Sequence, residues 1–167
     1  MFSSERLRTE HLLDAFDSGE TVLDEWLRTS EVNADRMGTA RAFVWVDDDE
    51  RVVAYFSLCP HEIRREAVCQ KLGRGSPAVI PSILLARLAL HRQLHGRGLG
   101  AQLLTDAVSR AVHAVRVAGG RFVVIDALHE HAAGFYRHHG FTPSPTNPLR
   151  LVMKASDAAA SAGIEWT

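Results

Sequence analysis

The sequence predicts an α/β protein of the α+β type, with a mixed central sheet of six to seven strands flanked by about four helices. The apolar run at 83–90 is typical of a strand covered on both faces. A broad apolar stripe at helical spacing follows from Gly98 to Val115, which predicts a long helix packed on that sheet. Helices and a hairpin precede this pair, and strand, helix and strand follow it.

The N-terminal part is expected to begin with two helices. Residues 10–15 suggest a short first helix, and residues 16–19 then form a turn. Ser18 or Gly19 can cap the second helix, and Gly38 ends it. The apolar residues of the second helix recur at helical spacing at Val22, Leu23, Trp26 and Leu27.

A β-hairpin is expected next, from Arg41 to Val46 and from Arg51 to Cys59, around a charged turn. Residues 60–81 are the least regular part and carry an excess of basic side chains. They are interpreted either as a solvated connecting arm or as a contact surface for a polyanion or a partner.

The C-terminal part continues the alternation of helix and strand. Gly119 and Gly120 stop the long helix, and residues 121–128 form the next strand. A short helix then carries Tyr136, and Phe141 opens a last hairpin that returns through residues 149–153. Residues 1–155 are expected to form one domain, and the Ala/Ser-rich residues 156–167 a mobile tail with little to bury.

Composition places the chain among ordinary globular proteins. Of its 167 residues, 46% are apolar and 23% charged, and the formal net charge is −1. Two cysteines make neither a metal spacing nor a disulfide framework, and no apolar run approaches a membrane span. The N-terminus lacks an apolar signal core, so a cytoplasmic protein without a membrane contact is expected.

The turn between the central strand and the long helix has the composition of an anion site. Gly96, Gly98 and Gly100 allow a tight backbone curl, and the following helix N-terminus adds its positive dipole end. The dinucleotide and Walker patterns both fail here, so the expected ligand carries phosphate without being a dinucleotide or a P-loop nucleotide. His91 and His95 have no second ligand pair at metal spacing, so no metal site is expected.

Two motifs give a family resemblance. Residues 95–100, His-Gly-Arg-Gly-Leu-Gly, resemble the acetyl-CoA signature of the GNAT acetyltransferase superfamily, although His95 stands where Gln or Arg is usual. Residues 132–141 resemble the A-x-x-F-Y-x-x-x-G-F segment near the end of that fold. The resemblance implies the GNAT fold, in which two parallel central strands splay apart to admit the pantetheine arm.

Acetyl-CoA is therefore the expected cofactor, as the acetyl donor. Its pyrophosphate is expected on the backbone N–H groups of the glycine turn, and its pantetheine along the strand edge, where the N–H of Leu90 could polarise the thioester carbonyl. The expected acetyl-CoA-binding residues are Leu88, Ala89, Leu90, His95, Gly96, Arg97, Gly98, Leu99, Gly100, His129 and Phe135.

Further segments resemble the TacT-type acetyltransferase toxins, over about residues 10–153. They include Leu23–Leu27, 54–58, 85–90 and 141–149. This branch implies an enzyme that acetylates the α-amine of an aminoacyl-tRNA and stops translation. It also implies a ribbon-helix-helix antitoxin, a homodimer, and DNA contact only through the antitoxin in a complex that represses its own operon.

Binding of tRNA needs basic side chains, and the near-neutral chain must supply them as a local patch. The candidates are Arg64, Arg65, Arg87 and Arg92. For Arg87, a long side chain reaching the strand edge is the alternative interpretation.

Tyr136 stands where the family has its general acid. A phenol keeps its proton at neutral pH and can donate that proton to a departing thiolate. No general base is evident; His129 and Glu130 are candidates. Two other functions stay open: a GNAT enzyme that acetylates a small amine or a protein amine, and a binding protein that acts as co-repressor within a toxin–antitoxin complex.

Overall fold

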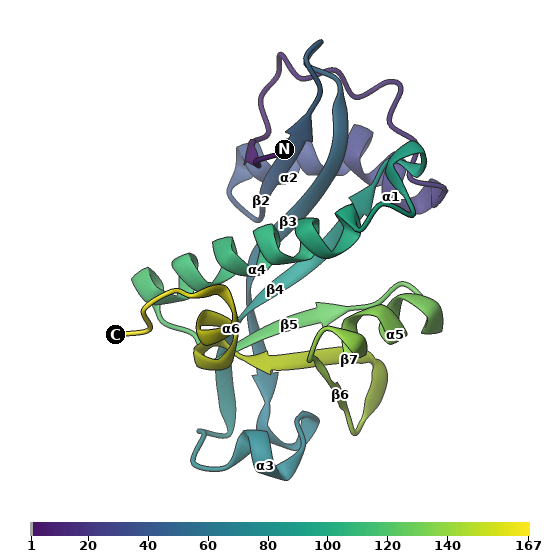
Figure 1. The fold of residues 1–167 in the computed structure, drawn as a ribbon. Helices are drawn as coiled ribbons and strands as arrows, with labels where there is room; N and C mark the ends of the chain where they lie inside the picture. The colour runs from purple at the N-terminus through teal and green to yellow at the C-terminus, as the bar shows by residue number, and fades with distance from the viewer. Residues whose placement is uncertain (1) are drawn as a thin grey trace. The chain divides into compact units, whose positions relative to one another are not determined.

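The computed structural model describes residues 2–167, and its seven strands form one hydrogen-bonded series (Figure 1). Their order is β1-β2-β3-β4-β5-β7-β6. The strands are β1 (Glu5–Arg6), β2 (Arg41–Val46), β3 (Val52–Arg64), β4 (Val79–Leu90), β5 (Phe122–Asp126), β6 (Thr142–Ser144) and β7 (Asn147–Lys154). β4 and β5 pair in parallel, whereas β2 with β3 and β5 with β7 pair antiparallel, so the expected mixed sheet is confirmed.

Six α-helices lie between or after the strands along the described chain. They are α1 (Thr21–Trp26), α2 (Val32–Met37), α3 (Gln70–Gly73), α4 (Leu99–Ala118), α5 (Glu130–His138) and α6 (Ala155–Ala162). A π-helical turn, η1 (Leu27–Glu31), joins α1 to α2, and two 3-10 turns lie at η2 (Arg65–Ala67) and η3 (Arg92–Leu94). No helix within residues 2–167 is long and apolar enough to cross a membrane.

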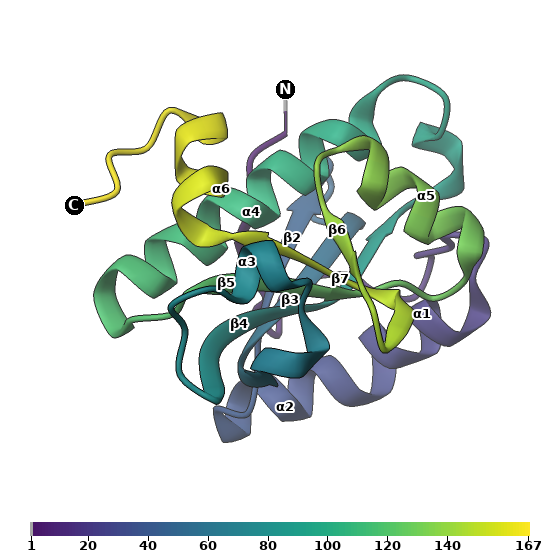
Figure 2. The same ribbon diagram turned by 90° about the horizontal axis from the view of Figure 1, so that it is seen from below.

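The described chain divides into two compact units, one up to Cys59 with Ala86–Ala107, the other Pro60–Leu85 with Val108–Thr167. In the first unit, β2 alternates between two faces. Ala42 and Val44 pack with Leu27 of η1, whereas Trp45 points the other way and donates from Nε1 to Asp106 of α4 at 2.8 Å. Figure 2 shows the α1–α2 run on one side of β2 and β3.

The second unit is built on β5, whose side chains alternate between two covered faces. Phe122 and Val124 pack with Val152 of β7 and with Val68, which lies between η2 and α3. The segment from β3 to β4 therefore folds back over the sheet instead of forming an open arm. Helix α5 lies beside β7 in this unit (Figure 1).

Two sequence-based expectations in the N-terminal half are wrong, and a third is confirmed. Residues 10–15 form turns rather than a helix, because the backbone of Leu12 bridges to Arg51 instead. The second helix is capped by Glu20 and not by Ser18 or Gly19, since the Ser18 hydroxyl donates to Asp24 at 2.7 Å. Gly38 does end α2, in the left-handed conformation.

The region 60–81 is more regular than expected. β3 continues through Pro60 to Arg64, and β4 already begins at Val79. The residues between β3 and β4 are ordered by the hydrophobic packing of Val68 and Leu72, because these side chains join the core cluster of the second unit.

The C-terminal segment forms α6, which directly follows β7 in Figure 2. Ala155, Ala158 and Ala159 are fully buried there, and the Ala155 N–H donates to the Arg121 carbonyl oxygen at 2.8 Å. The expectation that residues 156–167 have little to bury is therefore wrong for the helical part. Small alanine side chains allow a helix to pack closely on its neighbours, and a search for large apolar side chains does not predict this burial.

Candidate functional site

The loop from β4 to α4 has the backbone that the glycine pattern predicts. Gly96 and Gly98 adopt φ values of +78° and +74°, a region that side chains with a Cβ rarely enter. Among the described residues, no heavy atom beyond the chain neighbours lies within 4 Å of the position a Cβ would take at either glycine. The loop is exposed and ends where α4 begins at Leu99. It thus offers open backbone and a helix N-terminus to an anion.

Histidine side chains fix this loop. His95 donates from Nε2 to the carbonyl oxygen of Leu90 at 2.8 Å, because a carbonyl can only accept. His91 accepts from the Gln93 N–H through Nδ1 at 3.2 Å, and its Nε2 faces the Ala15 carbonyl oxygen at 3.2 Å. Both ring nitrogens of His91 are thus occupied by backbone groups.

One cluster of metal-type side chains occurs within residues 2–167, formed by Glu5, His11 and Glu50. His11 is buried, and its Nδ1 accepts from the Arg8 N–H at 2.9 Å. Nε2 of the neutral ring therefore carries the proton and donates to Glu5 at 3.2 Å. That nitrogen has no lone pair for a cation, so the cluster is a hydrogen-bonded tie of the N-terminal segment.

The last part of β4 carries the residues expected along the pantetheine. The parallel pairing of β4 with β5 covers Ser82 to Leu85, and β4 then continues for five more residues to Leu90. Leu88 is half-buried, whereas Ala89 and Leu90 are buried. The side chains thus pack inward, and what the strand offers a ligand there is its backbone.

Tyr136 lies in α5 and is 7% exposed. Burial raises the pKa of its phenol to about 12, because the charged form loses hydration. The ring packs edge-on against Phe135, with centroids 5.4 Å apart. A phenol in this setting keeps its proton throughout the neutral range and is suited to donate it.

The start of α5 involves both candidate bases. His129 caps the helix, since its Nδ1 accepts from the Ala132 N–H at 3.2 Å. Glu130 accepts from Arg137 at 2.7 Å in an exposed ion pair. Each candidate therefore has a structural partner. Neither becomes an evident base in the structure.

The four arginines expected at the acceptor fall into both units. In the first unit, Arg92 bridges to Asp17 at 2.6 Å, which lowers the pKa of that carboxyl chiefly through the hydrogen bond. Arg87 lies under Trp26, with the guanidinium carbon 4.1 Å from the ring centroid. The role of Trp26 was not evident from sequence, where it is one apolar position of a helix.

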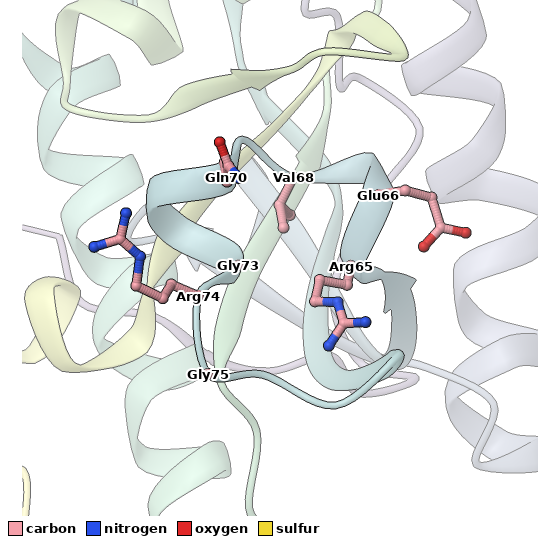
Figure 3. Close-up of a pocket in the computed structure, with 7 residues that line it drawn as sticks. All are labelled: Arg65, Glu66, Val68, Gln70, Gly73, Arg74 and Gly75. Carbon is pink, nitrogen blue, oxygen red and sulfur yellow. The ribbon is translucent and has the colours of Figure 1, made fainter.

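In the second unit, Arg64 is exposed at the end of β3, and Arg65 lines a pocket of about 510 Å³ between η2 and the loop after α3 (Figure 3). Arg65 donates to the Ser76 carbonyl oxygen at 2.9 Å. Figure 3 shows the Arg74 side chain on the opposite side of the pocket and directed away from it. The two guanidinium groups thus do not converge on a common point.

Comparison with known proteins settles the family. A family model described as an acetyltransferase (GNAT) domain matches residues 39–143. The chain belongs to the GNAT acetyltransferases. The chain is therefore an N-acetyltransferase whose acetyl donor is acetyl-CoA, which confirms the family, the enzyme class and the cofactor predicted from sequence.

Relatives within the family are toxins. A tRNA-acetylating toxin of Mycobacterium tuberculosis is 40% identical over 149 residues, 89% of each chain. The structure of AtaT complexed with acetyl-methionyl-tRNAfMet matches with a TM-score of 0.88 at 28% identity, covering 96% of this GNAT chain and 99% of that one. An AtaT mutant toxin bound to the C-terminus of the antitoxin AtaR and acetyl-CoA matches with a TM-score of 0.82 at 28% identity, over 96% and 97% of the two chains.

Proposed function

We propose that this GNAT enzyme acetylates the α-amine of an aminoacyl-tRNA and thereby stops translation. The carrying observation is the 40% identity to a tRNA-acetylating toxin, which extends over 89% of both chains. An acetylated α-amine cannot attack a peptidyl ester, so the modified tRNA no longer serves as an acceptor on the ribosome. The acetyl-methionyl-tRNA complex of AtaT supports the same substrate class.

Acetyl-CoA supplies the thioester-bound acetyl group when it is bound. The backbone N–H groups of Gly96 to Gly100 hold its pyrophosphate, since the loop is exposed and no side chain would obstruct approach at Gly96 or Gly98. The backbone of Leu88 to Leu90 binds the pantetheine amides, and the Leu90 N–H polarises the acetyl carbonyl. His129 and Phe135 contribute from α5 and its cap.

Tyr136 acts as the general acid. Transfer moves the acetyl group from sulfur to nitrogen, so the sulfur gains a proton and the nitrogen loses one. The Tyr136 phenol has the proton to give, because burial raises its pKa to about 12. The amine needs no dedicated base, since an α-amine has an ordinary pKa of about 8 and is partly neutral in the cell.

Arg64, Arg65, Arg87 and Arg92 contribute to RNA binding. Arg64 is exposed, whereas Asp17 partly neutralises Arg92. The contribution of each therefore differs. Arg64 makes the larger long-range contribution to phosphate attraction, and it is screened by salt.

A ribbon-helix-helix antitoxin neutralises the enzyme, and DNA contact occurs only through that antitoxin. The AtaT complex with the C-terminus of AtaR supports a protein antitoxin. The enzyme itself assembles as a homodimer.

Addition of the purified enzyme and acetyl-CoA to a cell-free translation reaction tests the function, with Tyr136→Phe as control. Arrest by the wild type alone, with acetylated aminoacyl-tRNA recovered, is the expected result. Free CoA released on small amines without arrest would instead indicate a small-amine acetyltransferase. Arrest that persists without acetyl-CoA would point to a binding function.

A further inference from the structure

Trp26 and Arg87 form a stacked pair in the first unit that the acetyl-transfer chemistry does not use. Trp26 ends α1, and the π-helical turn η1 begins at the next residue. The guanidinium carbon of Arg87 lies 4.1 Å from the indole centroid. Trp26 nevertheless keeps 36% of its surface exposed, which makes it one of the most accessible large aromatic side chains of the chain. π-helical turns occur frequently at functional sites.

One hydrogen bond to the backbone holds the Arg87 guanidinium, and its other N–H donors are unused within the described chain. Its NH1 donates to the Ala86 carbonyl oxygen at 2.7 Å, the one acceptor the structure gives it within residues 2–167. A guanidinium carries five N–H donors in a planar fork. The half-buried side chain is thus preorganised by the indole, with several donors left for an external oxygen.

Buried polar residues support this pair. Glu31, at the end of η1, is 1% exposed, and its carboxylate lies close to the side chains of Ser57 and Trp26, without a well-formed hydrogen bond to a described residue. Ser57 of β3 is equally buried. Tyr55 of the same strand donates to the Leu23 carbonyl oxygen at 2.6 Å and fixes α1 on the sheet. Trp26 is therefore held on a rigid base and not on a mobile loop.

An exposed indole joined to a guanidinium with free donors matches the chemistry of an unpaired nucleotide. Bases stack on aromatic faces without regard to sequence, and arginine binds phosphate oxygens in a bidentate manner. A carboxylate-bearing peptide would use the guanidinium but would gain nothing specific from the open indole. Arg87 also directly precedes Leu88 to Leu90, where the acetyl donor is proposed to bind.

We propose that Trp26 and Arg87 bind an unpaired nucleotide of the aminoacylated 3′ end of the RNA, with the base stacked on the indole and the guanidinium on a backbone oxygen. This inference rests on the proposed function, because it assumes that an RNA end is the acceptor. It assigns to α1 a role in substrate binding beyond helix packing.

The test measures the Kd of the full chain for a short fluorescein-labelled single-stranded RNA that ends in CCA. Trp26→Leu keeps apolar bulk without a π-face, and we expect its Kd to rise about 5- to 150-fold, whereas Trp26→Phe keeps most of the affinity. Arg87→Gln also weakens binding and lowers the salt dependence of log K by about 0.7, as expected for one lost phosphate contact. Thermal unfolding of each variant verifies the fold.

Trp166→Ala is the matched control, because Trp166 is 37% exposed and lies after α6. It should bind the RNA as the wild type does. Equal affinities of the leucine and phenylalanine variants would overturn the proposal, as would wild-type binding to a blunt duplex alone.

The probe carries no amino acid, so this result is independent of acetyl transfer. If the wild type fails to acetylate charged tRNA while Trp26→Leu still loses RNA affinity, the proposed function fails and the binding site stands. If charged tRNA is acetylated with an unchanged KM by Trp26→Leu, the binding site fails and the function stands.

Discussion

The ring of His95 donates a hydrogen bond from Nε2 to the carbonyl oxygen of Leu90 across 2.8 Å. This bond joins the last residue of β4 to the loop that precedes α4, over a span of five residues. The position is one where the family usually has Gln or Arg, and the bond gives a physical reason why histidine serves there. A side-chain donor is what the loop needs, and an imidazole, an amide or a guanidinium each provides one.

His95→Ala should loosen the loop and weaken acetyl-CoA binding. A net hydrogen bond contributes about 0.5–1.5 kcal/mol, so KM for acetyl-CoA should rise a few-fold to about tenfold at nearly constant kcat. His95→Gln restores a donor and should remain close to the wild type. Steady-state kinetics with acetyl-CoA varied measures both. An equal rise in KM for the two variants would contradict the role of the donor.

Gly98→Ala should reduce both stability and acetyl-CoA affinity. The residue has φ +74° and open space where a Cβ would stand, so the backbone strain alone costs about 1–2 kcal/mol. Gly163→Ala is a matched control, because Gly163 has φ +68° in equally open space at the end of α6. Both variants should lower Tm alike. Only Gly98→Ala should also weaken acetyl-CoA binding in calorimetry, because its methyl group projects where the phosphate approaches.

Tyr136→Phe should lower kcat about 100-fold or more while the fold persists. Because burial raises its pKa to about 12, Tyr136 keeps nearly all of its proton up to about pH 10. Ionisation of Tyr136 therefore causes no fall in the kcat of the wild type as pH rises to about 10. A wild-type limb near about pH 9 that disappears in Tyr136→Phe would show that the phenol titrates lower in the enzyme and would contradict this assignment.

Local sequence patterns predicted the helix ends that depend on neighbouring residues, and failed where distant residues determine the conformation. Helix α4 begins after Gly96 and Gly98 and ends before Gly119 and Gly120, as expected. These four glycines have positive φ values, which favour glycine whatever the tertiary surroundings. The helix expected at 10–15 failed because long-range partners decide that segment. The backbone of Leu12 bonds to Glu50 and Val52, which are distant in the sequence.

The candidate site divides in the same way. Its loop and Tyr136 belong to contiguous motifs, and a motif can be read along the chain. Arg87 could be placed at a strand edge from sequence, but its partner could not, since Trp26 lies in a different element and the contact forms only in the folded chain. The buried carboxylate of Glu31 was missed because its helical position resembles a solvated one.

Glu31→Gln should change how stability depends on pH. Burial raises the pKa of this carboxyl above its ordinary 4.5, and the nearby Ser57, Trp26 and Arg87 oppose the rise only in part. The folded chain therefore holds the proton more tightly than the unfolded chain. The free energy of unfolding falls as pH rises from about 4.5 through the raised pKa, and then levels off.

A glutamine has no proton to lose, so Glu31→Gln should remove this fall and match or exceed the wild type at about pH 7. Urea unfolding between about pH 4 and pH 8 measures the effect. Glu25→Gln is the control, since Glu25 lies exposed in α1 and should leave the wild-type slope intact. If Glu31→Gln keeps the wild-type dependence of unfolding free energy on pH, the raised pKa is wrong.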